Sequence, residues 1–255
     1  FDDLARQLAD SSARLAAART EIERMDAARR QFFAWISHDL RTPLAGMRAM
    51  AEALEDGRAS DPAGYVRQMR AKVDTVDRMV DDLFELSRLQ SDAVLPVREP
   101  VDLLDVVSDA VADVRPLATA RGIRIVQEGI AGCVLDADPR ELARVVGNLL
   151  SNAVRHTPDD SEVLVSGRLD GGTVTLAVVD RGAGVADADL GRMFDVGWRG
   201  DPARTIDGAS GAGAGLGLAI VRGIVEAHGG SVRAAHRPEG FCVELTLPAA
   251  TPHPV

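Results

Sequence analysis

The sequence has 255 residues and a formal net charge of −10, with 46% hydrophobic but only 4% aromatic residues. Such a chain can form one large or two modest domains, and its negative charge argues against a general nucleic-acid binder. Cys133 and Cys242 match no zinc spacing or disulfide framework, which favours a reducing compartment. No apolar run is long enough to span a bilayer. Because Phe1 falls inside a helical pattern, we expect a fragment of a longer protein.

The first segment predicts a long helix with a coiled-coil seam. Apolar residues recur at alternate spacings of three and four from Phe1 to Ile36, and no Gly or Pro interrupts the run before Pro43. A pattern sustained over so many heptads is typical of a coiled coil. A lone amphipathic helix on a globular domain is the alternative.

A second apolar seam follows the helix breakers Gly57, Pro62 and Gly64. Its members are Val66, Met69, Val73, Val76, Val80 and Leu83. Two seamed helices joined by a short loop predict an antiparallel hairpin. One hairpin buries only part of its seams, whereas two hairpins close a four-helix bundle, so we expect a homodimer.

Beyond the expected linker at Pro96 and Pro100, strand and helix patterns mix. Alternation on both sides of a turn at 170–172 predicts a β-hairpin, and a turn at 237–240 leads into a strand at 241–247. Helical patterns cover about 138–156 and 216–228. Together they predict an α/β layered domain, followed by a frayed tail from Pro248 to Val255.

An octapeptide late in the first helix carries a candidate nucleophile. It is Ser37-His38-Asp39-Leu40-Arg41-Thr42-Pro43-Leu44. His38 stands two residues past the seam position Ile36, about 200° around the helix, and so faces away from the bundle core. Imidazole is a good nucleophile near neutral pH, and Asp39 can accept or orient its ring proton. A lone exposed histidine is usually a bystander, but this octapeptide on a dimeric helix favours a function.

A polar helix face forms the second candidate. Asn148, Asn152, Arg155 and His156 share one side of the helix predicted at 138–156, because they stand at i, i+4, i+7 and i+8. An asparagine carbonyl is a hard oxygen ligand that suits Mg²⁺. A solvated face is the ordinary alternative. The helix also has a packing side, however, made by Leu142, Val145, Val146, Leu149 and Leu150.

Two glycine-rich segments complete the set. Asp180-Arg181-Gly182-Ala183-Gly184-Val185 directly follows a predicted strand, although so short a pattern is often only a turn. Gly211-Ala212-Gly213-Ala214-Gly215-Leu216-Gly217-Leu218 runs into a predicted helix, and glycines at a helix start expose backbone N–H groups that suit phosphate. The glycine-rich stretch before that helix indicates a mobile lid, with a flexible linker as the alternative.

In order and spacing these segments resemble the H box, N box and two glycine boxes of bacterial sensor histidine kinases. The resemblance implies that ATP phosphorylates His38 and that the phosphoryl group passes to an aspartate of a response regulator. It implies that Asp39, where Glu is commoner, acts as a base. It gives Thr42 a water-holding role in dephosphorylating the regulator. It also assigns Asn152 to Mg²⁺ and Asn148 to the neighbourhood of that metal.

The same resemblance gives roles to the remaining site residues. Arg155 contacts phosphate, with His156 beside it, and Asp180 accepts a hydrogen bond from the adenine amino group. The other expected nucleotide contacts come from the glycine boxes: Gly182, Gly184, Gly213, Gly215, Leu216 and Gly217. In the F box, Met193-Phe194-Asp195 fits, but Gly197 replaces a second Phe, for which Trp198 is the candidate substitute. No motif includes His228, His236 or His253, which we expect to be incidental.

The resemblance implies an α+β fold in four parts. They are a coiled-coil signalling helix at 1–30, a dimerisation and histidine phosphotransfer hairpin at 31–95, an ATP-binding α/β sandwich shared with gyrase-type ATPases and heat-shock chaperones at 96–248, and a tail at 249–255. The implied cofactors are ATP and Mg²⁺. The implied partners are a second copy, forming a homodimer, and a cognate response regulator, with no nucleic acid. The expected location is the cytoplasmic portion of a membrane-bound sensor, attached through a missing upstream segment.

Two other interpretations stay open. One is a non-catalytic dimeric scaffold or phosphatase-only relative, against which the intact nucleotide boxes argue. The other is an ATP-hydrolysing clamp or serine kinase of the same superfamily, against which His38 in its octapeptide argues.

Overall fold

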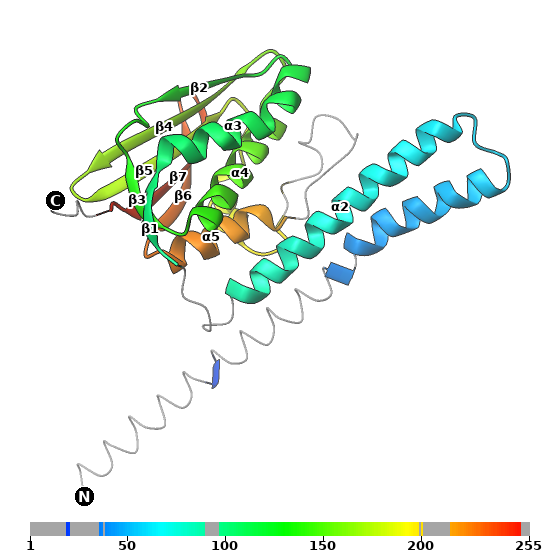
Figure 1. The fold of residues 1–255 in the computed structure, drawn as a ribbon, viewed down its shortest axis with the longest axis horizontal. Coiled ribbons are helices and arrows are strands. Elements are labelled where there is room, and N and C mark those ends of the chain that lie inside the picture. Colours follow the sequence, from blue (N-terminus) through cyan, green and yellow to red (C-terminus); the bar gives the residue numbers. More distant parts are fainter. Residues whose placement is uncertain are drawn as a thin grey trace, which may run out of the picture. The chain divides into compact units, whose positions relative to one another are not determined.

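The structure, a computed structural model, describes residues 19–20, 36–37, 39–89, 97–198, 200 and 215–250 (Figure 1). These residues fall into two compact units, divided between Asp77 and Arg78. Most of the expected coiled-coil seam lies outside the described residues. Within the described ranges, no helix combines the length and the apolar character needed to cross a membrane.

The first unit contains most of the predicted helical hairpin, whose second helix continues past Asp77 into the second unit. One helix covers residues 39–55, and α2 (Pro62–Leu89) begins after a short turn. Gly57, at φ 65°, ends the first helix, because few other residues adopt this left-handed conformation without strain. The Asp61 side chain accepts the backbone N–H of Gly64 at 2.9 Å and so caps α2, with Pro62 in the position where a missing N–H costs nothing.

A single hairpin leaves its apolar seam partly uncovered. Val66 is 56% exposed and Val73 is 45% exposed, although both are seam positions of α2. On the facing helix, Leu44 is 50% exposed. The helices approach closely where Gly46 faces the aliphatic stem of Lys72, because a Cβ at Gly46 would lie 3.1 Å from Lys72 Cε.

The second unit contains the α/β domain. A five-stranded sheet has the order β2-β4-β5-β7-β6, in which β2 and β4 are parallel and the other pairs antiparallel, while β1 and β3 form a separate antiparallel pair. The elements are β1 (Glu99–Asp102), α3 (Leu103–Ala120), β2 (Arg124–Glu128), β3 (Val134–Ala137), α4 (Pro139–His156), β4 (Glu162–Asp170), β5 (Thr173–Asp180), η1 (Asp187–Asp189), η2 (Arg192–Phe194), α5 (Gly217–Ala227), β6 (Ser231–Arg237) and β7 (Gly240–Pro248).

The core lies between this sheet and the layer formed by α3, α4 and α5 (Figure 1). On β5, Val174, Leu176 and Val178 alternate along one face and are all buried. The opposite face carries a smaller cluster of Ala177, Val179 and Cys242. The sequence-based prediction of a helical hairpin followed by an α/β domain is therefore confirmed.

The residues that follow β7 are hydrogen-bonded, whereas the sequence predicts a frayed tail there. The backbone N–H of Ala249 donates to the Gly172 carbonyl, and that of Ala250 donates to the Val134 carbonyl, each at 2.9 Å. The prediction of a frayed tail from Pro248 onward is therefore wrong as far as Ala250. Residues 251–255 lie outside the described residues.

Candidate functional site

The candidate phosphoacceptor segment is described only in part. His38 lies outside the described residues, whereas Asp39 and Thr42 lie near the start of the helix over 39–55. Asp39 is buried, with 6% of its surface exposed, and Thr42 is exposed. Pro43 is buried within the same helix, which continues through it.

The two asparagines of α4 lie on the less buried side of the helix, opposite its apolar residues. Asn148 and Asn152 are half-buried, while all five residues of the predicted packing side are buried. The helix starts at a strong cap, where Asp138 accepts the N–H of Arg140 at 3.0 Å and Pro139 occupies the first turn. The Nδ2 atom of Asn148 is buried without a hydrogen-bond partner among the described residues. A buried amide donor in this state is a candidate ligand contact.

Arg155 and His156 end the polar face of α4. Both are exposed residues, yet the surrounding protein lowers the pKa of each. For His156, removal of water is the main cause, followed by the nearby positive charges of Arg155 and Arg121. Because both side chains still reach solvent, water screens part of these effects. A histidine held towards its neutral form can donate one hydrogen bond and accept another.

Asp180 is a buried carboxyl at the end of β5. Only 5% of its surface is exposed, and burial raises its pKa to about 6, although the backbone N–H of Gly182 counteracts this by donating to Oδ1 at 2.7 Å. A side chain at Gly182 does not fit, because its Cβ would lie 2.6 Å from the carbonyl oxygen of His156. The first glycine box and the end of α4 therefore lie against each other.

The second glycine segment meets the F box and the asparagines. Gly215 has φ 67°, and its carbonyl accepts the N–H of Gly197 at 3.1 Å. This bond joins the two ends of the expected lid, most of which, including Gly213, lies outside the described residues. Leu216 is buried, and a Cβ at Gly217 would lie 3.4 Å from Asn148 Oδ1. The start of α5 thus faces the polar side of α4.

The first half of the F box is buried and holds this segment in place. Met193 and Phe194 are buried in η2, which anchors the segment that leads to Gly197. Trp198 is half-buried, and its backbone N–H donates to the Asp195 carbonyl at 3.1 Å. A Cβ at Gly215 would lie 2.8 Å from the Trp198 carbonyl oxygen. The backbone of this segment, and not a second phenylalanine side chain, contacts the end of the lid.

Two histidines that we expected to be incidental are built into the fold. His228 is 1% exposed, accepts the backbone N–H of Asp138 at Nε2 (3.0 Å), and donates from Nδ1 to the Ile224 carbonyl at 2.8 Å. It therefore ties the end of α5 to the cap of α4. His236 contacts the first glycine box through the Val185 carbonyl. No local motif marks either residue, because each joins its strand or helix to a segment distant in sequence.

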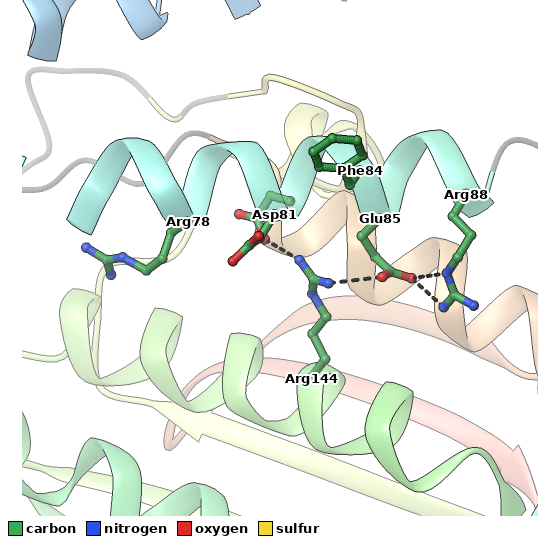
Figure 2. A pocket seen from close by; sticks show the side chains of 7 residues that line it. Arg78, Asp81, Phe84, Glu85, Arg88 and Arg144 are labelled. Atoms are coloured by element: carbon green, nitrogen blue, oxygen red, sulfur yellow. Dashed lines mark hydrogen bonds and ion pairs between the residues drawn. The ribbon is translucent and has the colours of Figure 1, made fainter. Parts of the chain in front are cut away.

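An ionic network joins the last turns of α2 to α4. Arg144 reaches Asp82 at 2.7 Å and Glu85 at 3.0 Å, and Arg88 pairs with both Glu85 and the buried Glu141. Figure 2 shows Arg144 rising from α4 towards the α2 carboxylates, with Glu85 between two arginines. Because Arg144 lies one turn before Asn148, the network fixes the helix that carries the asparagines.

Metal binding by a cluster of protein side chains has no support within the described ranges. These ranges contain no group of three or more His, Cys, Asp or Glu residues arranged to hold a metal ion. A magnesium ion at Asn152 would therefore need oxygen ligands from the nucleotide and water, which is how proteins commonly hold Mg²⁺.

Comparison with known proteins identifies two domains in the chain. Residues 28–92 match the family described as His Kinase A (phospho-acceptor) domain. Residues 137–251 match the family described as Histidine kinase-, DNA gyrase B-, and HSP90-like ATPase. The chain is 37% identical over 233 residues to the sensor-like histidine kinase SenX3 of Mycolicibacterium smegmatis, an alignment that covers 90% of this chain and 60% of SenX3.

Solved structures agree in fold. The crystal structure of full-length ShkA in complex with AMPPNP matches with a TM-score of 0.62 and 29% identity, over 86% of this chain and 45% of that one. The histidine kinase ThkA, solved in complex with the response regulator protein TrrA, matches with a TM-score of 0.69 at 16% identity, over 86% of this chain and 61% of that one. With its paired domains, the chain belongs to the sensor histidine kinase family. It spans less than two thirds of SenX3.

Proposed function

We propose that this chain is the catalytic core of a sensor histidine kinase that phosphorylates His38 from ATP and transfers the phosphoryl group to an aspartate of a response regulator. The observation that carries the proposal is the close approach of Asp180, a buried carboxyl, and Gly182 to the end of α4, where a side chain at Gly182 would collide with the His156 carbonyl. The match of this part of the chain to an ATPase family supports the assignment of Asp180 and Gly182 to the adenine base.

The residues around Asp180 fit a nucleotide. An ionised carboxylate can accept the adenine amino group, and Gly182 and Gly184 let backbone approach the flat base. About two turns back along the same face of α4, Asn148 has a buried Nδ2 with no partner among the described residues and lies beside Gly217 at the start of α5. Backbone N–H groups at that helix start suit phosphate oxygens. We assign Gly213, Gly215 and Leu216 to the same end of the nucleotide.

The triphosphate end needs charge neutralisation more than covalent assistance. We assign Mg²⁺ to Asn152, whose carbonyl oxygen is a ligand of the right kind on the half-buried face of α4. Bound there, the metal would neutralise charge on the phosphates. Arg155 adds a positive charge one turn further along, with His156 beside it.

In the phosphoryl transfer, an unprotonated ring nitrogen of His38 attacks the γ-phosphorus of ATP. The bond from the γ-phosphorus to the bridging oxygen breaks, ADP leaves, and the ring proton passes to Asp39. The nitrogen–phosphorus bond then breaks when a carboxylate of the regulator takes the phosphoryl group. Thr42 lies on the exposed side of the same helix, where its hydroxyl can orient a water molecule for the separate reaction that hydrolyses the phosphoryl group from the regulator's aspartate and releases inorganic phosphate.

Two partners are proposed, one from the exposed apolar surface of the hairpin and one from a similar protein of known structure. We propose a homodimer because Val66, Val73 and Leu44 leave an apolar surface on the hairpin that a second hairpin would cover. A response regulator is proposed because ThkA was solved with one. Because the chain spans 60% of SenX3, we propose that it acts in the cytoplasm as part of a longer sensor attached to the membrane.

Incubation with labelled ATP and Mg²⁺ tests the proposal. The wild-type protein should acquire a label that is labile in acid and stable in alkali, which marks phosphohistidine. His38→Ala should lose the label but bind ATP with unchanged affinity, because the nucleotide residues lie in the other unit. A label that survives acid would indicate a serine kinase. Absence of label on the wild-type protein would indicate a scaffold or a clamp. An unchanged label on His38→Ala would indicate that another residue is the acceptor.

A further inference from the structure

His236 lies on β6 directly opposite Phe241 of β7. Its Nε2 is 2.8 Å from the carbonyl oxygen of Val185, so this nitrogen carries a hydrogen and donates it. The two rings meet edge to face, with centroids 5.2 Å apart and planes at 64°. The Asp187 carboxylate is 3.6 Å from the same nitrogen, which is too far for a hydrogen bond, so the Val185 carbonyl is the partner.

The same two rings support the first glycine box. Gly184 has φ 64°, and a Cβ there would lie 2.5 Å from Phe241 Cδ2 and 2.7 Å from His236 Cε1. The backbone of Gly184 therefore rests directly on both rings, and the next residue, Val185, is held by the imidazole. The last residues of the loop over 180–185 are fixed by packing and by one hydrogen bond.

The turn between β6 and β7 holds the beginning of the loop. The guanidinium of Arg181 donates to the carbonyl oxygen of Glu239. Asp180 pairs with Phe241 in the β5–β7 ladder, and a Cβ at Gly240 would lie 3.3 Å from Arg181 Cα. The loop that carries the candidate adenine contacts is thus fastened at both ends to one β-hairpin.

We propose that His236 is a positioning residue for nucleotide binding: its hydrogen bond to the Val185 carbonyl holds the first glycine box so that Asp180 and Gly182 meet the adenine base. The inference rests on the proposed function, because it concerns the same nucleotide site. Loss of the bond frees the loop end, so the nucleotide must order it on binding, which weakens affinity. The phosphoryl transfer step is untouched, since it occurs at the other end of the nucleotide.

Three substitutions separate the hydrogen bond from the ring. His236→Phe keeps an aromatic ring on Phe241 and Gly184 but has no donor. His236→Gln loses the ring but places an amide N–H at a similar reach from the backbone. His236→Ala loses both. Ser231→Ala is the matched control, because it removes a 2.9 Å side-chain hydrogen bond to Thr246 at the far end of the same strand.

The measurements are the Kd for ATP and the KM and kcat of self-phosphorylation, with the thermal midpoint of each variant. His236→Phe and His236→Ala should raise Kd and KM about fivefold at unchanged kcat, the factor that one neutral hydrogen bond contributes. His236→Gln should restore most of the affinity, and Ser231→Ala should bind as the wild type does. If His236→Ala does not fold, the Phe and Gln variants still decide.

Unchanged ATP affinity in His236→Phe, or equal weakening in the Phe and Gln variants, would overturn the role of the hydrogen bond. A fall in kcat with KM unchanged would also overturn it. The proposed function fails in a different way, namely if the wild-type protein binds no ATP or if Asp180→Asn binds ATP normally. That result removes the nucleotide site itself, and the inference about His236 falls with it.

Discussion

Burial of the Asp180 carboxyl, which we propose as an adenine contact, lowers the stability of the folded domain. With 5% of its surface exposed, its pKa rises from 3.8 to about 6 because burial removes water from the carboxylate. A difference of about two pKa units corresponds to about 3 kcal/mol at 1.36 kcal/mol per unit. This is the free energy by which the ionised carboxylate destabilises the folded domain at neutral pH.

The substitution Asp180→Asn should therefore stabilise the nucleotide-free protein. It removes the charge and keeps an oxygen that can accept the Gly182 N–H. At pH 7.5 we expect the free energy of unfolding to rise by up to about 3 kcal/mol, or roughly 6–12 °C in Tm for a domain of this size. The same variant should bind ATP poorly, because a carboxamide is a weaker acceptor for the adenine amino group than a carboxylate.

The sign of the pH dependence follows from the raised pKa. Protonation of Asp180 in the folded state stabilises the wild type fully below about pH 4, and this contribution is lost as pH rises through 6. The stability gap between Asp180→Asn and wild type should therefore be smallest near pH 4 and reach its full size above pH 7. Urea unfolding followed by circular dichroism at several pH values measures the gap.

A matched control keeps the comparison specific. Asp170 is the exposed last residue of β4, so Asp170→Asn should change stability little at any pH. If the gap for Asp180→Asn at pH 7.5 were absent, or if it were the same at pH 4.5, the carboxyl would not be desolvated as its burial indicates. The ionised carboxylate would then not destabilise the folded domain.

Four further substitutions test other parts of the molecule. Asn152→Ala should weaken ATP binding at least tenfold in the presence of Mg²⁺ and little in EDTA, as titration calorimetry would show; equal losses in both would remove the metal assignment. Thr42→Ala should spare self-phosphorylation and slow dephosphorylation of the cognate regulator, measured with the isolated phosphorylated regulator; an unchanged rate would contradict its role. Pro43→Ala should raise the thermal midpoint and shift the ratio of kinase to phosphatase activity, since proline in a helix interior removes a hydrogen bond and favours a kink. A raised midpoint with an unaltered ratio would show that Pro43 is structural only. Glu85→Gln should lower the free energy of unfolding by about 1 kcal/mol in urea titrations, because it weakens two half-buried ion pairs; no change would mean that water already screens them.

The sequence predicted those elements whose pattern is local. The hairpin over β4 and β5 was predicted because apolar residues alternate on both sides of Asp170-Gly171-Gly172, and the structure pairs these strands in antiparallel register. The polar face of α4 was predicted because its apolar residues recur with helical spacing and are all buried. In both cases the spacing of apolar and polar residues determines which face of the element is buried, and that spacing can be read from the sequence alone.

Other elements could not be predicted because their patterns are short or interrupted. Strands β1, β2 and β3 have four or five residues each, too few for alternation to stand out. Helix α3 contains Pro116, and proline disfavours a helix locally. The packing of the apolar side of α3 against α4 outweighs this unfavourable propensity. His228 and His236 were missed because each acts on a residue at least 50 positions away.

The ionic network between α2 and α4 matters for anyone who grafts kinase domains onto foreign sensors. The last three turns of α2 share a compact unit with the ATPase fold, and Arg144 and Glu141 find their charge partners there. A fusion joint in the expected linker, at Pro96, would leave Arg88 and Asp82 behind, so that Glu141 and Arg144 would lose the α2 side chains that pair with them. A joint placed before Arg78 carries the matching charges along with the transplanted domain. Chimeras joined at the two points should therefore differ in solubility and nucleotide affinity, although they differ by fewer than 20 residues of α2 and linker.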